Sequence, residues 1–325
     1  MTDRPKALVT APFRGEGLDT LQSIADVVLD PWIDHRPLRL YNAEDLAARI
    51  EAEGADLLIV ESDSVKGPVL DLGLLAIGSC RGDPNNVDIP AATAKGIPVL
   101  HAPGRNADAV AEMTIALVFA VNRGLVRADL DVRAGEVWSN GTIPYQRFRA
   151  WQLAGRTAGL VGLGAVGQAT RWRLEGLGMR VIAYDPYNPE ATHSLDQLLE
   201  ESDVVSMHAK VTPETEGLMG AGQFARMREG ALYVNSARAQ LHDTDALVDS
   251  LVLGHLGGAG LDHFVGENLP IDHPLCAMPN VVLTPHIGGA TYDTEANHSR
   301  LIADDLRRLL AGERPTHICN PEVLA

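Results

Sequence analysis

The chain has 325 residues, of which 46% are hydrophobic and 22% charged, and this length favours two hydrophobic cores over one. Its formal net charge of -16 argues against a nucleic-acid partner, because an acidic chain gains nothing from the phosphate backbone. The three cysteines, Cys80, Cys276 and Cys319, are too few and too far apart to predict a disulfide framework or a metal site.

No segment has the composition of a membrane span or a signal peptide. The longest apolar run, MTIALVFAV (113–121), is about half the length that a bilayer span needs. The amino-terminal segment MTDRPKALVT contains no apolar region of signal-peptide length. We therefore expect a soluble, cytoplasmic protein without a membrane partner.

In the first third of the chain, short runs of strand-forming residues alternate with helical patterns. Strands are expected over 6–10, 26–30, 56–62, 74–80 and 97–103, with helical stretches that include 42–54 and 88–96. Strand–helix alternation at this spacing predicts a parallel sheet with helices on both faces.

A long helical region over 107–136 interrupts this alternation, and a loop rich in aromatic residues and arginine follows it at 138–151. A second α/β series then begins, and a helix over 293–311 comes near the end of the chain. The strands of this series are expected over 157–161, 180–184, 203–208, 231–236, 258–263 and 280–284. Two α/β units joined by a long helix favour a ligand cleft between them.

The second series opens with a glycine-rich loop. Gly162, Gly164 and Gly167 form a G-x-G-x-x-G pattern directly after an apolar strand and at the start of a helix. Such glycines permit a tight turn, close approach of a pyrophosphate and packing of the helix on the strand. Asp185 ends the next strand, eighteen residues after Gly167, where it can accept hydrogen bonds from a ribose 2′-hydroxyl. The motif predicts a dinucleotide site, and the acidic residue favours NAD over NADP.

Three more stretches stand at strand ends of this series: VNSAR (234–238), GAGLDHFVGE (258–267) and LTPHIGG (283–289). Ligands of open α/β sheets bind beyond the carboxyl ends of the strands, so the polar side chains there are site candidates. They are Arg238, Asp262, Glu267 and His286. Each also has an ordinary alternative, because Arg238 could pair with any surface acid, Glu267 could be solvated and Asp262 could be a turn residue.

Their chemistry fits together. An arginine fork can hold a carboxylate by two hydrogen bonds. A carboxylate beside a histidine favours the protonated imidazole and fixes its orientation, which makes a usable proton donor near neutral pH.

These segments together resemble the D-isomer-specific 2-hydroxyacid dehydrogenase family, which includes phosphoglycerate, glycerate/glyoxylate and D-lactate dehydrogenases. The similarity covers nearly the whole chain, including NADAVAEMTIALVFAVNR (106–123), YDPY (184–187) and TPETEGLMG (212–220). It also includes the family's Arg–Glu–His set, here Arg238, Glu267 and His286, twenty-nine and nineteen residues apart.

The resemblance implies two doubly wound parallel-sheet domains. A Rossmann NAD-binding domain over 107–290 would be inserted in a flavodoxin-like substrate domain formed by 1–106 and 291–325. It also implies a homodimer that forms through 113–150.

The implied reaction transfers a hydride between the nicotinamide of NAD and C2 of a small D-2-hydroxy acid or 2-oxo acid. His286 would act as general acid/base, Glu267 would keep it protonated, and Arg238 would bind the substrate carboxylate and carbonyl oxygen. No metal is expected, because Arg238 supplies the electrophilic charge.

The family's layout further implies which residues contact the ligands. Cofactor contacts are expected from Gly162, Gly164, Ala165, Val166, Gly167, Asp185, His208, Thr212, Ser236, Ala237, Asp262, Gly288 and Gly289. Substrate contacts are expected from Arg81, Gly82 and Arg238.

The chain departs from the family's common pattern in two places. His263 stands where the family often has Val, and Asn268 stands where it often has Pro. The loop SCRGDPNNVD (79–88) differs from the commoner Gly-Val-Gly-x-Asp pattern. Arg81 in this loop could pair with Asp83 at the surface, or it could select a substrate that carries a second anionic group.

Two related functions compete with this prediction. Formate dehydrogenases share the fold, but that branch pairs Gln with His, whereas this chain keeps Glu267. NAD-sensing corepressors use the same fold as a binding module, and we expect such a protein to carry extra partner-binding tails.

Overall fold

The structure is a computed structural model that describes residues 4–139 and 141–324. Residues 1–3, 140 and 325 belong to the ranges predicted for the substrate domain and the dimer contact, and they lie outside the described residues. The chain forms two compact units, one made of Met1–Asn106 with Thr291–Ala325 and the other of Ala107–Ala290.

The first unit is a five-stranded parallel sheet in the order β2-β1-β3-β4-β5, covered by helices on both faces. Its elements are β1 (Lys6–Val9), α1 (Glu16–Ile24), β2 (Asp26–Leu29), α2 (Ala43–Glu53), β3 (Leu57–Val60), β4 (Ala76–Ser79), α3 (Ile89–Ala94), β5 (Val99–His101) and α12 (Tyr292–Leu310). Strand β3 reads LLIV and is buried on both faces, as a central parallel strand must be.

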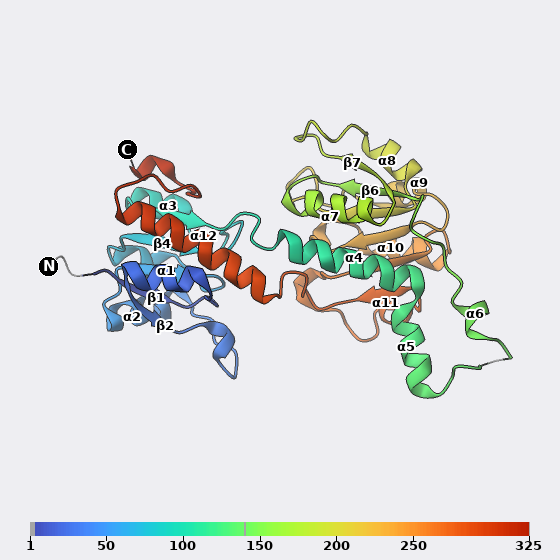
Figure 1. The fold of residues 1–325 in the computed structure, drawn as a ribbon, viewed down its shortest axis with the longest axis horizontal. Coiled ribbons are helices and arrows are strands. Elements are labelled where there is room, and N and C mark those ends of the chain that lie inside the picture. Colours follow the sequence, from blue (N-terminus) through green and yellow to red (C-terminus); the bar gives the residue numbers. More distant parts are fainter. Residues whose placement is uncertain (1–3, 140, 325) are drawn as a thin grey trace. The chain divides into compact units, whose positions relative to one another are not determined.

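Alternate side chains of the central strands enter two different cores. Leu58 points to the core that α2 and α3 cover, whereas Leu57 points to the core that α1 and α12 cover. Helix α12 brings Ile302 and Leu306 into that second core, and Figure 1 shows α12 lying beside α1 although the two are far apart in sequence. Burial of these apolar side chains supplies the main driving force that folds this unit.

The second unit contains a six-stranded parallel sheet in the order β11-β10-β9-β8-β6-β7. Its strands are β6 (Thr157–Val161), β7 (Arg180–Tyr184), β8 (Val204–Met207), β9 (Leu232–Asn235), β10 (Gly258–Leu261) and β11 (Val281–Leu283). Its helices are α4 (Ala107–Arg123), α5 (Leu125–Ala134), α6 (Pro144–Arg147), α7 (Ala165–Gly176), α8 (Leu195–Glu201), α9 (Ala221–Arg226), α10 (Thr244–Val252) and α11 (Pro274–Ala277).

One core packs α4 and α7 against this sheet, and another packs α8, α9 and α10 against it. The two parallel-sheet units confirm the predicted fold class. In the classic Rossmann order a third strand lies beyond the second. Here the chain leaves β7, passes through α8 and returns to β8 beside β6. The strand order therefore reverses between β6 and β8, which is where such sheets bind ligands.

The prediction of one helical region over 107–136 was wrong in detail. Helix α4 ends at Arg123, and α5 begins at Leu125 after a bend of 60°. Gly124 between them has φ 58°, a left-handed backbone that favours glycine and stops a helix. Among the described residues no single helix is long and apolar enough to cross a membrane, and only the bent pair α4 and α5 reaches that length and composition.

Candidate active site

The glycine loop connects β6 to α7 at the point where the strand order reverses. Gly162 has φ 97°, and a Cβ there would come within 2.6 Å of the backbone of His208 and Ala209. A Cβ at Gly167 would lie 2.3 Å from the carbonyl oxygen of Gly162. Only glycine fits at these two positions, because the loop packs directly on the segment that follows β8.

The amino-terminal end of α7 can receive an anion. Gly164 and Ala165 are exposed, and no side-chain hydrogen bond caps the helix. A Cβ added at Gly164 would have no neighbouring heavy atom within 4 Å, so the space in front of this residue is open. The N–H groups of the first turn and the positive end of the helix dipole suit a phosphate group. The residues of this loop therefore fit the pyrophosphate of NAD(H).

Asp185 lies beside the same loop. Its Oδ2 accepts a hydrogen bond from the Leu163 N–H at 2.8 Å, and its Oδ1 accepts one from the Tyr187 N–H at 2.9 Å. These bonds orient the carboxylate at the end of β7, next to the glycine loop.

The other predicted cofactor contacts near this loop have partners within the second unit. The Thr212 hydroxyl donates to Glu214 at 2.7 Å, and the hydroxyl of Ser236 lies 2.7 Å from that of Thr114. Burial lowers the pKa of His208 to about 4, so its ring is neutral at neutral pH. The buried Nδ1 atom of His208 has no hydrogen-bond partner among the described residues.

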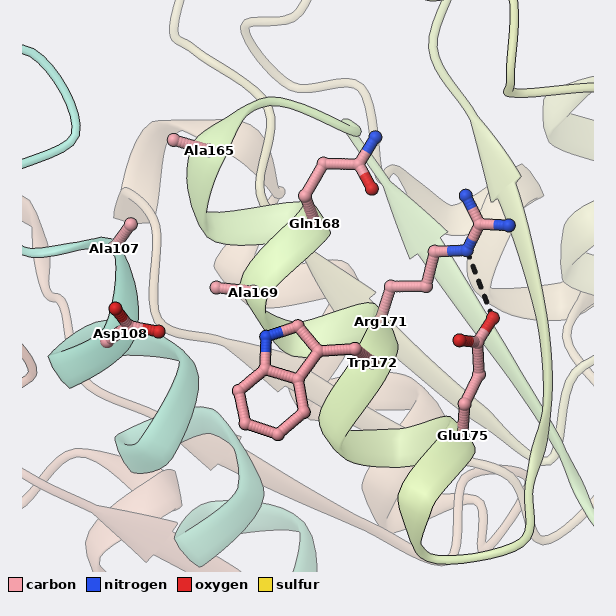
Figure 2. Close-up of a pocket in the computed structure, with 8 residues that line it drawn as sticks. All are labelled: Ala107, Asp108, Ala165, Gln168, Ala169, Arg171, Trp172 and Glu175. Atoms are coloured by element: carbon pink, nitrogen blue, oxygen red, sulfur yellow. Dashed lines mark hydrogen bonds and ion pairs between the residues drawn. The ribbon is translucent and has the colours of Figure 1, made fainter.

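A groove of about 500 Å³ runs between α4 and α7 (Figure 2). It is lined by Ala107, Asp108, Ala165, Gln168, Ala169, Arg171, Trp172 and Glu175. Figure 2 shows that the Trp172 ring extends toward α4, while Arg171 pairs with Glu175 at 3.0 Å on the other side of α7. The groove starts at the end of α7 that faces the cofactor loop, and both carboxylates that line it pair with arginines, Asp108 with Arg173 and Glu175 with Arg171.

Arg238 follows β9 in a turn that the buried Asn235 side chain holds. The Asn235 Oδ1 accepts hydrogen bonds from the backbone N–H groups of Ala237 at 3.0 Å and Arg238 at 3.2 Å. Its Nδ2 donates to the Arg238 carbonyl oxygen at 2.8 Å. An asparagine that mimics a backbone turn explains why Arg238 leaves the strand edge with an exposed side chain.

Glu267 and His286, nineteen residues apart, meet by their side chains. The Nδ1 of His286 lies 2.9 Å from the Oε1 of Glu267. Both residues have φ 55°, a left-handed backbone that is uncommon for side chains larger than glycine. Strain of this kind is concentrated at functional sites, where the surrounding structure maintains it.

Asp262 maintains the turn that carries His286. This carboxylate is fully buried, and its Oδ1 accepts from the Thr284 hydroxyl at 2.6 Å and the Ile287 N–H at 3.0 Å. Its Oδ2 accepts from the Gly288 N–H at 2.7 Å, and a Cβ on Gly288 would lie 2.9 Å from that oxygen. The structure thus gives Asp262 and Gly288 a positioning role, and their predicted contact with the cofactor stays a prediction, as does that of Gly289.

His263 connects the three candidate catalytic residues. Its ring packs against that of His286 with centroids 3.7 Å and planes 50° apart, and its Nδ1 lies 3.9 Å from the Oε1 of Glu267. Its Nε2 lies 3.4 Å from the Nη1 of Arg238, which also donates to the Ala237 carbonyl at 2.6 Å. Burial, and then the neighbouring His286 and Arg238, lower the pKa of His263 to about 3, so this ring is neutral.

Sequence reasoning identified the ends of the strands but missed what His263 and Asn235 do. His263 was visible only as a departure from the family's usual Val. The position of Asn235 at a strand end could have predicted its role, because an asparagine there often forms a turn by hydrogen-bonding to nearby backbone.

Arg81 and Gly82 belong to the first unit, after β4. The Nη1 of Arg81 donates to the Glu61 carbonyl oxygen at 3.4 Å, and the Arg81 carbonyl accepts from the Ala102 N–H at 2.8 Å. The Gly82 carbonyl lies 2.9 Å from the Nδ1 of His101. These bonds hold the loop at the carboxyl edge of the first sheet.

Comparison with known proteins shows which family this chain resembles in sequence and in fold. The model of the D-isomer specific 2-hydroxyacid dehydrogenase NAD binding domain matches residues 115–288. A glyoxylate reductase of Thermofilum pendens is 39% identical and covers 99% of this chain and 96% of its own length. A D-3-phosphoglycerate dehydrogenase of Methanocaldococcus jannaschii is 32% identical and covers 97% of this chain and 59% of its own length.

A solved structure has the same architecture. A protein of Thermus thermophilus is 37% identical, with a TM-score of 0.82 over 97% of this chain and 99% of its own. The predicted cofactor, NAD(H), is confirmed by the match to the NAD-binding domain. The predicted enzyme class, an NAD-dependent 2-hydroxyacid dehydrogenase, is confirmed by the same match and by the relatives. The chain belongs to the D-isomer specific 2-hydroxyacid dehydrogenase family.

Proposed function

We propose that this enzyme reduces a small 2-oxo acid to the D-2-hydroxy acid, with His286 as the proton donor. Bound NADH supplies the hydride that C2 of the substrate receives. Protonated His286 gives its proton to the carbonyl oxygen, and in the reverse direction neutral His286 takes the hydroxyl proton. The observation that carries the proposal is the 2.9 Å contact between the His286 Nδ1 and the Glu267 Oε1, which leaves the His286 Nε2 for the substrate.

Glu267 and Arg238 complete the proposed chemistry. The Glu267 carboxylate fixes the orientation of the His286 ring and stabilises its charged form. The Arg238 guanidinium, which is exposed at the strand edge, binds the substrate carboxylate and polarises the C=O bond. Arg81 and Gly82 belong to the first unit, and their contact with substrate stays a prediction.

The test of this function is an NADH-oxidation screen in buffer that contains a metal chelator. The panel is glyoxylate, hydroxypyruvate, phosphohydroxypyruvate, pyruvate and branched 2-oxo acids. Glyoxylate and hydroxypyruvate are expected among the best substrates, because a glyoxylate reductase is similar over nearly the full length of both chains. Tight NADH binding without turnover of any member would contradict the proposal and favour the corepressor alternative.

Asp185 is proposed to select NAD over NADP. Its carboxylate, oriented by the Leu163 and Tyr187 N–H groups, would accept bonds from a ribose 2′-hydroxyl and repel a 2′-phosphate. Asp185→Ala is expected to narrow the ratio of kcat/KM for the two cofactors, mainly through KM. Equal kcat/KM for NADH and NADPH in the wild type would contradict this role.

A homodimer through 113–150 is part of the proposal. Helix α5 has no buried residue, and it presents Leu125, Val126, Leu130 and Val132, each at least half exposed. Figure 1 shows α5 and α6 projecting from the sheet of the second unit. Light scattering should give twice the chain mass of 34.8 kDa, and Leu130→Glu should shift the protein toward monomer. A monomeric wild type at micromolar concentration would contradict the dimer.

A further inference from the structure

Three side chains at the candidate active site present metal-ligand atoms to one another. The Nδ1 of His286 and the Nδ1 of His263 lie 2.9 Å and 3.9 Å from the Oε1 of Glu267. One ligand atom of each of the three residues lies within 4.8 Å of the other two, and no other three His, Cys, Asp or Glu side chains in the described part of the chain do so. Proton transfer by His286 and Glu267 does not require His263, so the third ligand is unexplained by the proposed chemistry.

Two imidazole nitrogens and one carboxylate oxygen form a set that Zn²⁺ binds with tetrahedral geometry and one open position. Bonds of about 2.0–2.2 Å place tetrahedral ligand atoms about 3.3–3.6 Å apart. The separations of 2.9 Å and 3.9 Å lie on either side of that range, and the exposed side chains of Glu267 and His286 would have to shift to complete the geometry.

The backbone holds these ligands in place without a metal. His263 is 4% exposed and fixed by its neighbours, and Asp262 fixes the turn of His286 through the Ile287 and Gly288 N–H groups. The side chains of Glu267 and His286 are about half exposed, which gives an ion a path from solvent. His263 is thus a rigid ligand, and Glu267 and His286 are ligands that an ion can reach, which gives the site an entry path.

Arg238 opposes the ion and limits its affinity. Its Nη1 lies 3.4 Å from the Nε2 of His263, and it would lose this acceptor once a metal holds the His263 Nδ1 and the ring proton moves to Nε2. The contact is long, and the same nitrogen keeps its 2.6 Å bond to the Ala237 carbonyl. The guanidinium charge also repels a cation, so binding should be reversible and weaker than in a closed structural zinc site.

We propose that His263, Glu267 and His286 form a binding site for Zn²⁺ that is inhibitory and is not used by the reaction. The ion replaces the proton between His286 and Glu267. The inhibitory consequence rests on the proposed function, because an ion on Nδ1 prevents His286 from serving as the imidazolium donor. The binding itself does not depend on that function.

The experiment measures Zn²⁺ binding by titration calorimetry on the full chain after chelator treatment, and then inhibition of NADH oxidation by Zn²⁺. Wild type should bind one Zn²⁺ per chain. His263→Val should weaken binding at least 10-fold, and a cooperative thermal unfolding transition checks that the variant folds. As a matched control, His193→Val removes an imidazole that lies 3.2 Å from the Thr192 hydroxyl, outside the proposed site, and should leave binding unchanged.

Glu267→Gln removes a different ligand and should also weaken Zn²⁺ binding, which keeps the test valid if His263→Val does not fold. Co²⁺ should give the visible absorption of a tetrahedral site in wild type and lose it in both variants. Absence of binding in wild type, or equal binding in the His263 and His193 variants, would overturn the site. Site-specific binding that leaves NADH oxidation unaffected would support the site and instead contradict the role of His286.

Discussion

Each unit of the molecule contains an arginine, a glutamate and a histidine that contacts link, directly in the first unit and through His263 in the second, and the two sets differ in burial. In the first unit the Nη2 of Arg105 pairs with the Oε1 of Glu61 at 2.6 Å, and its Nη1 lies 2.6 Å from the Nδ1 of His298. The Nε2 of His298 lies 2.6 Å from the Pro12 carbonyl oxygen. The Glu61 and Arg105 side chains are 13% and 16% exposed, and His298 is fully buried.

In the second unit the same residue types are exposed. The side chains of Glu267 and His286 are 58% and 44% exposed, and both residues have a left-handed backbone. A buried, satisfied network contributes to stability and orders the fold, whereas an exposed pair held in a strained turn can exchange a proton with a ligand. Residue type alone does not separate a structural set from a reactive one; burial and backbone conformation do.

Replacing the carboxylate of the exposed set should have a large effect on rate. Glu267→Gln can still hydrogen-bond His286 but no longer stabilises its charge, so we expect kcat to fall by about 10–10². NADH affinity and the melting temperature should stay near the wild-type values. The assay is steady-state NADH oxidation in the presence of chelator, with fluorescence titration of NADH as control. A kcat within twofold of wild type would place Glu267 outside the chemistry.

Replacing Arg81 tests whether this residue supports the buried set or recognises the substrate. Its guanidinium donates to the carbonyl oxygen of Glu61, which is a member of the buried set. If Arg81 binds a second anionic group, Arg81→Ala should lower kcat/KM for phosphohydroxypyruvate or 2-oxoglutarate by about 10-fold or more, while kcat/KM for glyoxylate changes little. A hydrogen bond to a charged group, worth about 1.5–3 kcal/mol, gives an effect of this order. Equal losses on all substrates would instead assign Arg81 to carboxylate binding or to loop structure.

The buried set should respond to acid. Burial, and then the charge of Arg105, lower the pKa of His298 to about 4. The unfolded chain, in which a histidine titrates near 6.5, therefore binds this proton more readily than the folded chain. The stability that neutral His298 provides is complete above about pH 6.5 and is lost as the pH falls toward 4.

His298→Gln should therefore lower the melting temperature at pH 7 by several degrees, as expected for about 1–3 kcal/mol of lost hydrogen bonding. It should also reduce the loss of melting temperature between pH 6.5 and 4.5. The variant should keep part of that loss, because burial also lowers the pKa of His208 and of His242 to about 4 and that of His263 to about 3. Calorimetric melts at both pH values test this, and an unchanged pH dependence would contradict the role of His298.

Local patterns predicted much of this fold and site. Short apolar runs predicted the strands, and the glycine loop with Asp185 predicted the cofactor end, because a tight βα turn depends on neighbouring residues. The break at Gly124 was missed because a single glycine inside a helical pattern is often tolerated. The roles of His263 and Asn235 depend on contacts between distant turns, and no local period encodes them.

The central claim is that the exposed set in the second unit performs proton transfer, and His286→Ala tests it most directly. Kinetics of NADH oxidation by the best 2-oxo acid should show kcat reduced by about 10²–10⁴, the usual contribution of a general acid. NADH affinity and melting temperature should stay near those of the wild type, because His286 is exposed and lies outside the core. A variant that retains near-wild-type kcat would contradict the account.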